Sequence, residues 1–236
     1  MTLPQTILKV RTHLLDLIFP IVCLNCGKEG LYLCKMCNAK LKRDEFQICP
    51  VCGKPNPFGA THIECKSEVN LDGLVSAVPY KEPLARKLVE HCKYRFISDI
   101  APTLGQIIAE EILNLELTKS FENFTVVPLP LHPKRKNWRG FNQSELIAIE
   151  LNKHLNLRLD PTILYRKIHT KVQAELKDEE RKTNVAGAFA SDQNLSGRKI
   201  LLIDDVSTTR STLSQACLAL KNNGASEVWA AVFAQG

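Results

Sequence analysis

The sequence lacks any long apolar run. Its 236 residues contain no uninterrupted apolar run of about 18, the length that a membrane-spanning helix needs. The apolar stretch 14–22 is interrupted by Asp16 and is followed by no small-residue cleavage site, so we expect no signal peptide. Together these absences predict a cytoplasmic protein without a membrane span.

A phosphate-binding loop of the Walker type is also absent. No segment fits the pattern GxxxxGK[ST], which excludes nucleotide binding of that kind. The hydrophobic content of 44% and the charged content of 24% are typical of a globular protein. The formal net charge of +6 agrees with an anionic substrate or with nucleic acid, although a basic surface often serves solubility alone.

Nine cysteines stand in this chain without an export signal, a combination that favours metal binding over disulfide bonds. Seven of them lie between Cys23 and Cys65, where they form three C-x-x-C pairs and one H-x-x-C pair. A C-x-x-C turn lets two thiolates approach one Zn²⁺ at about 2.3 Å, and a glycine after the second cysteine permits a tight turn. The predicted zinc ligands are Cys23, Cys26, Cys34, Cys37, Cys49, Cys52, His62 and Cys65.

Eight ligands make two four-coordinate sites. The simplest partition is sequential, with the first four ligands in one site and the last four in the other. An interleaved partition, which joins the first and third pairs, stays open, and His62 has the alternative of an ordinary surface histidine. Because every coordination position is filled, we expect both zinc ions to be structural and to supply folding free energy that so short a segment cannot gain from a core. Cys92 and Cys217 lie apart from these pairs and are predicted to be buried packing residues.

Residues 199–212 carry the clearest chemistry. The apolar run 200–203 predicts a strand buried on both faces of a parallel sheet. Asp204 and Asp205 follow at its carboxyl end, where open α/β sheets bind ligands, and they suit sugar hydroxyls or Mg²⁺. A hydroxyl-rich turn then leads into a helix whose first turn suits a phosphate. The stretch predicts a site for a phosphorylated sugar. The alternative is an ordinary strand followed by a polar helix cap. The residues of the turn are Ser207, Thr208, Thr209, Arg210, Ser211 and Thr212.

A basic loop follows a second predicted strand, 124–130. Four cations beside Gly140 favour the binding of a pyrophosphate group. Two interleaved aromatic residues leave open the binding of single-stranded nucleic acid, whose bases stack on aromatic rings. The third alternative is a solvated run of charge that binds no ligand. The cations are Lys134, Arg135, Lys136 and Arg139, and the aromatic residues are Trp138 and Phe141.

Strands and helices alternate along the rest of the chain, which predicts a mainly parallel sheet with flanking helices. Residues 4–19 predict an amphipathic helix that packs on the fold or, alternatively, lies on a membrane surface. Residues 166–188 are polar and lack apolar periodicity, as in a mobile active-site loop or a disordered segment. The other expected strands are 74–80, 163–165 and 227–234, and the expected helices are 83–94, 100–117, 144–154 with Ser144 as its N-cap, and 211–222.

These motifs resemble those of known families. The stretch 200–212 resembles the PRPP (phosphoribosyl pyrophosphate) signature of type I phosphoribosyltransferases, with Arg210 where that signature usually has glycine. Along nearly the whole chain, the sequence resembles the ComF family of phosphoribosyltransferase-like proteins, named for bacterial natural competence. The segments that carry this resemblance are the cysteine pairs, HCKYRF, VVPLPLHPKRKNWRGFNQSE, QAELKDEERKTNVAGAF and IDDVSTTRST.

The resemblance implies an α/β fold with a type I phosphoribosyltransferase-like, mainly parallel sheet and flanking helices, preceded by a small zinc-ribbon domain. The implied parts are an N-terminal helix at 1–20, a double zinc ribbon at 21–70 and a phosphoribosyltransferase-like domain at 71–236. Asp204 and Asp205 would contact the ribose, the turn 207–212 would cradle the 5-phosphate, and 166–188 would be the flexible loop. The implied pyrophosphate and loop contacts are Lys134, Arg135, Arg139, Gln143, Lys171 and Arg181.

Two classes of function follow. The first is an enzyme that transfers phosphoribosyl from PRPP, with Mg²⁺ and release of pyrophosphate, to an acceptor for which no residue stands out as a base. The second is a binding protein that holds PRPP and engages single-stranded DNA or DNA-uptake proteins during competence. A third alternative, a zinc-ribbon transcription factor, is disfavoured by the large α/β domain.

Overall fold

The computed structural model describes residues 20–66, 68–168, 187–208 and 211–236. The chain divides into two compact units between Leu41 and Lys42. The smaller unit contains the first cysteine cluster and the short helix α2, Lys35–Lys40. The predicted helix 4–19 and most of the predicted flexible loop lie outside the described residues.

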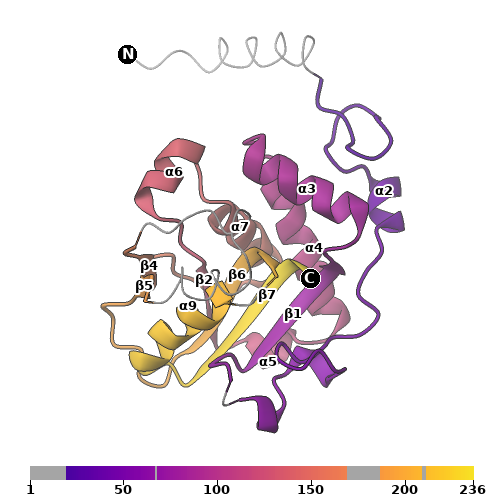
Figure 1. Ribbon diagram of the computed structural model, residues 1–236. Helices are drawn as coiled ribbons and strands as arrows, with labels where there is room; N and C mark the ends of the chain where they lie inside the picture. The colour runs from indigo at the N-terminus through magenta and orange to yellow at the C-terminus, as the bar shows by residue number, and fades with distance from the viewer. Residues whose placement is uncertain (1–19, 67, 169–186, 209–210) are drawn as a thin grey trace. The chain divides into compact units, whose positions relative to one another are not determined.

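A five-stranded, entirely parallel sheet forms the centre of the larger unit, with the order β1-β7-β6-β2-β3 (Figure 1). The predicted parallel α/β class is confirmed. Residues 200–203 of β6 are fully buried, because both faces of this central strand are covered. The strands are β1 (Gly73–Pro79), β2 (Phe124–Pro128), β3 (Arg158–Leu159), β6 (Lys199–Ser207) and β7 (Glu227–Gln235).

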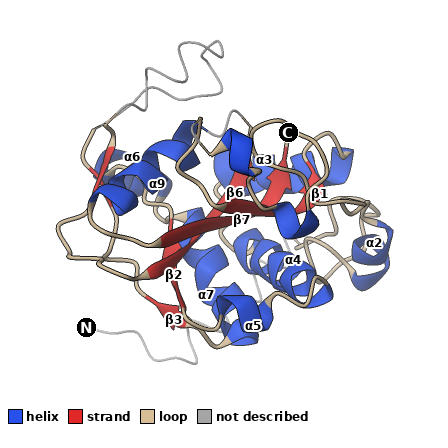
Figure 2. Cartoon of the chain, turned by 90° about the horizontal axis from the view of Figure 1, so that it is seen from below, coloured by secondary structure: helices blue, strands red, loops and turns tan. Residues whose placement is uncertain are grey.

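Helices cover both faces of the sheet. Figure 2 shows α9 on one side of the strands and α4 and α7 on the other. A separate antiparallel pair joins β4 (Tyr165–Arg166) to β5 (Phe189–Ala190). In the part of the chain that is described, no helix combines the length and the apolar character needed to cross a bilayer. The helices of this unit are α3 (Pro83–Tyr94), α4 (Ile100–Asn114), α5 (Thr118–Phe121), α6 (Pro133–Arg139), α7 (Gln143–Leu155) and α9 (Ser211–Asn222), with 3₁₀ turns at Pro57–Gly59 and Ile63–Cys65.

The outer side of the edge strand β1 is covered by the segment that precedes it. Gln47 exchanges two hydrogen bonds with the backbone of Ser76, accepting at 3.0 Å and donating at 2.9 Å, so its amide acts like a residue of a neighbouring strand. The same side-chain amide also donates to Glu111 Oε1 at 3.0 Å. An exposed strand edge invites pairing with other chains, and this contact removes part of that edge.

Local structure departs from the sequence predictions around the basic loop. The segment was expected to be a loop, but it contains the helix α6 (Pro133–Arg139), which follows the cap residue His132 and is capped at its end by Gly140 with a φ of 85°. The N-cap of α7 is Asn142, whose side chain accepts from the backbone N–H of Ser144. The prediction of Ser144 as the cap is therefore wrong, because its hydroxyl has a different partner.

The short strands β3 and β5 were also outside the sequence predictions. The expected strand 163–165 occurs as β4, which begins only at Tyr165. Ile163 and Leu164 are buried without belonging to a strand. Their apolar character reflects burial against the rest of the core rather than sheet pairing, and periodicity alone cannot separate these two causes in so short a run.

Candidate functional site

The acid pair lies at the carboxyl end of the central strand β6. Asp204 is 8% exposed and Asp205 is 1% exposed, which is unusual for carboxylates. Successive side chains of a strand point to opposite faces, so the two carboxyl groups reach different partners. Asp205 and Ser207 share one face, and Asp204 points to the other.

Asp204 is held by the first turn of α7. Ser144 Oγ donates to Asp204 Oδ1 at 2.8 Å, and the backbone N–H of Asp205 donates to the same oxygen at 2.9 Å. Burial, and then the neighbouring charge of Asp205, raise the pKa of the Asp204 carboxyl to about 7 despite these hydrogen bonds and the opposing charge of Lys93. This carboxyl group therefore changes its charge near neutral pH.

Asp205 is held from the side of α3. Lys93 Nζ, near the end of that helix, lies 2.9 Å from Asp205 Oδ1. Burial lowers the pKa of Lys93, but the charges of Asp205 and Asp204 outweigh that effect and raise the pKa above its usual value. The ion pair therefore keeps one oxygen of Asp205 engaged with a cation.

Two polar atoms of this site are buried and have no hydrogen-bonding partner among the described residues. They are Asp205 Oδ2 and Ser207 Oγ, which lie two residues apart on the same face of β6. Buried polar groups are nearly always paired, with protein groups, water or a ligand. A free carboxylate oxygen beside a hydroxyl suits a sugar hydroxyl or a hard cation, so the residues fit both ribose and Mg²⁺.

A buried arginine of β4 lies near the acid pair, and an arginine of α6 lies near that arginine. Arg166 of β4 is 8% exposed, and its guanidinium lies 5.1 Å from the ring centre of Phe189. Burial, and then the nearby charge of Arg135, lower the pKa of Arg166 to about 10, while Asp204 opposes this shift. Arg135 of α6 and Arg166 thus bring positive charge to the carboxyl edge near Asp204.

The other predicted site residues differ in their surroundings, and four of them lie outside the described residues. Arg139 Nη1 donates to Gln143 Oε1, and Arg139 Nε is buried without a hydrogen-bonding partner in the described residues. Lys136 instead pairs with Glu145 of α7 at 2.9 Å, and Lys134 is exposed on α6. Ser211 and Thr212 begin α9, Thr208 is exposed, and the predicted residues Thr209, Arg210, Lys171 and Arg181 lie outside the described residues.

Three residues of this site were missed at the level of sequence. Lys93, Ser144 and Arg166 reach the acid pair from elements that are 38 to 111 residues away along the chain. Lys93 and Ser144 lie in the segments that carried the family resemblance, but their spacing from the acids gives no local signal. Only the packing of α3, α7 and β4 around β6 brings these side chains together.

The eight predicted zinc ligands gather into two clusters in sequential order. Cys23, Cys26, Cys34 and Cys37 form one, and Cys49, Cys52, His62 and Cys65 form the other, with the ligand atoms of each within 4.8 Å of one another. The interleaved partition is therefore wrong. The donor sets, four thiols in one and three thiols with an imidazole in the other, are those of closed structural zinc sites.

The two clusters are built on the same turn. In each, the glycine after the second cysteine has positive φ, 74° for Gly27 and 70° for Gly53, and its N–H donates to the first cysteine's carbonyl group. Burial raises the pKa of Cys23, but backbone N–H groups led by that of Cys34 outweigh it and lower the pKa to about 6. Cys49 behaves in the same way, with His62 N–H first among the donors, and its pKa is also about 6. Each cluster therefore offers a thiolate at neutral pH, the form that binds metal.

Comparison with known proteins agrees with the presence of two metal clusters. Residues 14–67 match the family model described as a double zinc ribbon domain. The chain is 30% identical over 204 residues to DNA utilization protein YhgH of Escherichia coli K12, covering 84% of this chain and 88% of that protein. It is 29% identical over 222 residues to Competence protein F of Haemophilus influenzae, covering 89% and 95%.

A solved structure of a purine phosphoribosyltransferase from Pyrococcus horikoshii is also similar, with 15% identity, a TM-score of 0.35 and coverage of 69% of this chain and 77% of that one. The assignment rests on the relatives that share almost the full length. Their identity and coverage, together with the double zinc ribbon match, show that the chain belongs to the ComF/YhgH family.

Proposed function

We propose that the acid pair at the end of β6 binds PRPP and that the protein transfers its phosphoribosyl group to an acceptor. The observation that carries this proposal is the pair of buried, unsatisfied atoms, Asp205 Oδ2 and Ser207 Oγ, at the carboxyl edge of the sheet. An acceptor oxygen and a hydroxyl on one strand face suit the 2- and 3-hydroxyl groups of ribose. The start of α9, the next helix along the chain, suits the 5-phosphate.

The pyrophosphate would lie toward α6. Arg135 and Arg166 bring positive charge to that side of the acid pair, and Arg139 has a buried Nε without a partner in the described residues. Guanidinium groups bind phosphate oxygens in a planar, two-pronged manner. Mg²⁺ bound with PRPP would supply further neutralisation of the pyrophosphate charge.

In the proposed reaction, the bond from C1 of the ribose to pyrophosphate breaks, and pyrophosphate leaves with the electron pair. A nucleophilic atom of the acceptor forms the new bond to C1 and loses its proton to solvent. Positive charge develops on the sugar ring in this displacement, and the buried carboxylates below it stabilise that charge. The cations on the α6 side stabilise the departing anion.

Titration calorimetry with PRPP and Mg²⁺ at fixed salt tests the binding site. We expect micromolar binding by the wild type and its loss in the double variant Asp204→Asn/Asp205→Asn. Asp99→Asn, which changes an exposed acid before α4, serves as the matched control and should bind PRPP as the wild type does. Unchanged affinity in a folded double variant would refute the assignment.

A second candidate function is the binding of single-stranded DNA, in line with the names of the relatives, a DNA utilization protein and a competence protein. The observation that favours it is an exposed aromatic pair. Phe96 and Trp138 are 40% and 69% exposed, and their rings meet edge to face at 4.8 Å. Phe96 has a φ of 58°, a conformation that is strained for a bulky residue. Since strained residues cluster at binding sites and basic residues of α6 flank the pair, unstacked bases suit this surface.

Fluorescence anisotropy with a labelled single-stranded oligonucleotide tests this second function. We expect binding that weakens steeply with salt, and a loss of about tenfold in Trp138→Ala, as for the removal of one stacking contact. Ile149→Ala, which removes another exposed apolar side chain, is the control. Equal affinity of Trp138→Ala and the control would refute a stacking role.

A further inference from the structure

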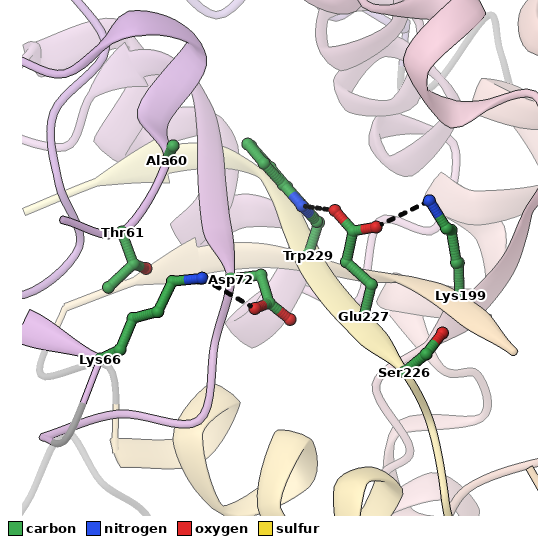
Figure 3. A pocket seen from close by; sticks show the side chains of 8 residues that line it. All are labelled: Ala60, Thr61, Lys66, Asp72, Lys199, Ser226, Glu227 and Trp229. Carbon is green, nitrogen blue, oxygen red and sulfur yellow. Dashed lines mark hydrogen bonds and ion pairs between the residues drawn. The ribbon is translucent and has the colours of Figure 1, made fainter. Parts of the chain in front are cut away.

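A cavity lies at the amino edge of the sheet, at the opposite end from the acid pair. It has a volume of about 390 Å³ and lies where β6 and β7 begin and where the chain enters β1 (Figure 3). Lys199 lines it and Asp204 stands five residues further along the same strand, which corresponds to about 17 Å at the usual rise per residue. The cavity is therefore separate from the proposed PRPP site.

An indole ring forms one wall of this cavity. Trp229 is partly exposed, its Nε1 donates to Glu227 Oε1 at 2.8 Å, and Phe121 packs edge to face against it at 5.6 Å. A Cβ atom at position 73 would lie 2.3 Å from the Trp229 ring, so only glycine allows the indole to lie this close to the start of β1. The ring is thus held in one place and offers a fixed aromatic surface.

Two lysines and two carboxylates line this cavity, and Lys221, which pairs with Asp72 from beside the lining, gives the lysines an excess of one. Glu227 is 2.9 Å from Lys199. Asp72 is 2.7 Å from Lys221, accepts from the backbone N–H of Val228 at 2.8 Å, and lies 3.7 Å from Lys66. Asp72 and Glu227 thus each have a close cation other than Lys66. The Lys66 side chain is 54% exposed, and its distance to Asp72 is the longest of these three ion pairs. A loose surface pair of this kind contributes little, so the ammonium of Lys66 can turn to an anion.

The loop of the second zinc cluster forms the facing wall. Lys66 follows the ligand Cys65, and Thr61 precedes the ligand His62. Thr61 is tied to the entrance of β1, since its N–H donates to the Asp72 carbonyl at 2.8 Å and its hydroxyl donates to the Leu71 carbonyl at 2.6 Å. The cluster therefore fixes the position from which Lys66 reaches the cavity.

We propose that this cavity is a second ligand site, for a small planar anion of mononucleotide size. The base would lie against Trp229, and the phosphate would be bound by Lys66 and Lys199. The volume falls at the lower end of the range for small-molecule sites, which matches one nucleotide rather than a polymer. The combination of one fixed aromatic surface with excess positive charge favours a ligand that has both a ring and an anionic group.

Intrinsic fluorescence tests the site directly, because the chain has only two tryptophans, Trp138 and Trp229. In the variant Trp138→Phe the signal comes from Trp229 alone. We expect AMP and CMP to change this fluorescence in a saturable manner, with adenosine and inorganic phosphate each binding at least tenfold more weakly. The titrations use the Asp204→Asn/Asp205→Asn background, so that the result is independent of the PRPP site.

The matched variants are Lys66→Gln, which removes the cation at the cavity, and Lys54→Gln, which removes an exposed lysine elsewhere on the same cluster loop. We expect Lys66→Gln to bind AMP about tenfold more weakly and Lys54→Gln to bind it with unchanged affinity. The absence of a saturable change at millimolar nucleotide, or equal affinities of the two lysine variants, would overturn the proposal. Binding of inorganic phosphate as tight as that of AMP would overturn the role of Trp229.

Discussion

Lys93 and Asp205 form an ion pair of 2.9 Å between α3 and the end of β6. The carboxylate side chain is 1% exposed, whereas that of the lysine is 23% exposed. The pair fixes the last turn of α3 beside the central strand and leaves the second oxygen of Asp205 for another partner. The geometry of the proposed sugar site therefore depends on a residue far from the acids in sequence.

Removal of Lys93 is expected to destabilise the fold. Lys93→Met leaves the buried Asp205 carboxylate without its cation, which should lower the free energy of unfolding by about 3 kcal/mol, at the low end of the range because the lysine is partly exposed. Urea denaturation measures the change. Lys87→Met, at an exposed position on the same helix, should cost no more than about 0.5 kcal/mol. Similar losses in both variants would contradict a structural role of the pair.

The raised pKa of Asp204 predicts a pH-dependent contribution to stability. Because burial and Asp205 raise this pKa to about 7, the folded state binds the proton more tightly than the unfolded state does. The contribution is fully present below about pH 4, the usual pKa of an aspartate, and is lost as the pH rises through about 7.

Asp204→Asn cannot titrate at this position and serves as the reference. The free energy of unfolding of the wild type should fall relative to that of this variant by about 4 kcal/mol between pH 4 and pH 8. Urea denaturation of both proteins across this range measures the difference, in which titrating groups that do not interact with Asp204 cancel. A difference that is constant with pH would show that Asp204 has an ordinary pKa in the folded protein.

The two metal clusters should contribute differently to the larger unit. Cys49→Ser changes the cluster that lies within this unit, and we expect it to lose one zinc and to lower the melting temperature by about 5 °C or more. Cys23→Ser changes the cluster of the smaller unit. It should lose one zinc with little effect on the melting temperature of the larger unit. Metal analysis and calorimetry check both results.

Cys92→Ala is the control for the zinc experiment, because Cys92 is a fully buried cysteine of α3 outside both clusters. Its zinc content should equal that of the wild type, whatever its stability. Loss of zinc from this control, or two zinc ions retained by Cys49→Ser, would show that the cluster has been assigned to the wrong ligands.

Features with a local cause could be predicted from the sequence. The C-x-x-C-G turns, the buried run 200–203 and the acids that follow it each depend on neighbouring residues, and the structure has them where the pattern places them. Cys92 and Cys217 are buried, as expected of cysteines outside the clusters. The alternation of strands and helices was enough to indicate the parallel sheet.

Features with a nonlocal cause could not be predicted. The hydroxyl of Ser144 was assigned to a helix cap, because that is the common local role of serine, but the packing of α7 places it beside Asp204. The same holds for Lys93, and for the cavity that Trp229 and the loop of the second cluster enclose. These contacts join residues that no period or spacing connects.

The proposed PRPP site depends most on Asp205 as a ligand of the ribose, and a pair of affinities measured by titration calorimetry tests that role. PRPP and pyrophosphate are titrated, each with Mg²⁺, into the wild type and into Asp205→Asn. We predict that the substitution weakens PRPP binding at least tenfold, about 1.4 kcal/mol, and leaves pyrophosphate binding within twofold, because only PRPP carries the ribose. Equal PRPP affinities in the two folded proteins would contradict the account.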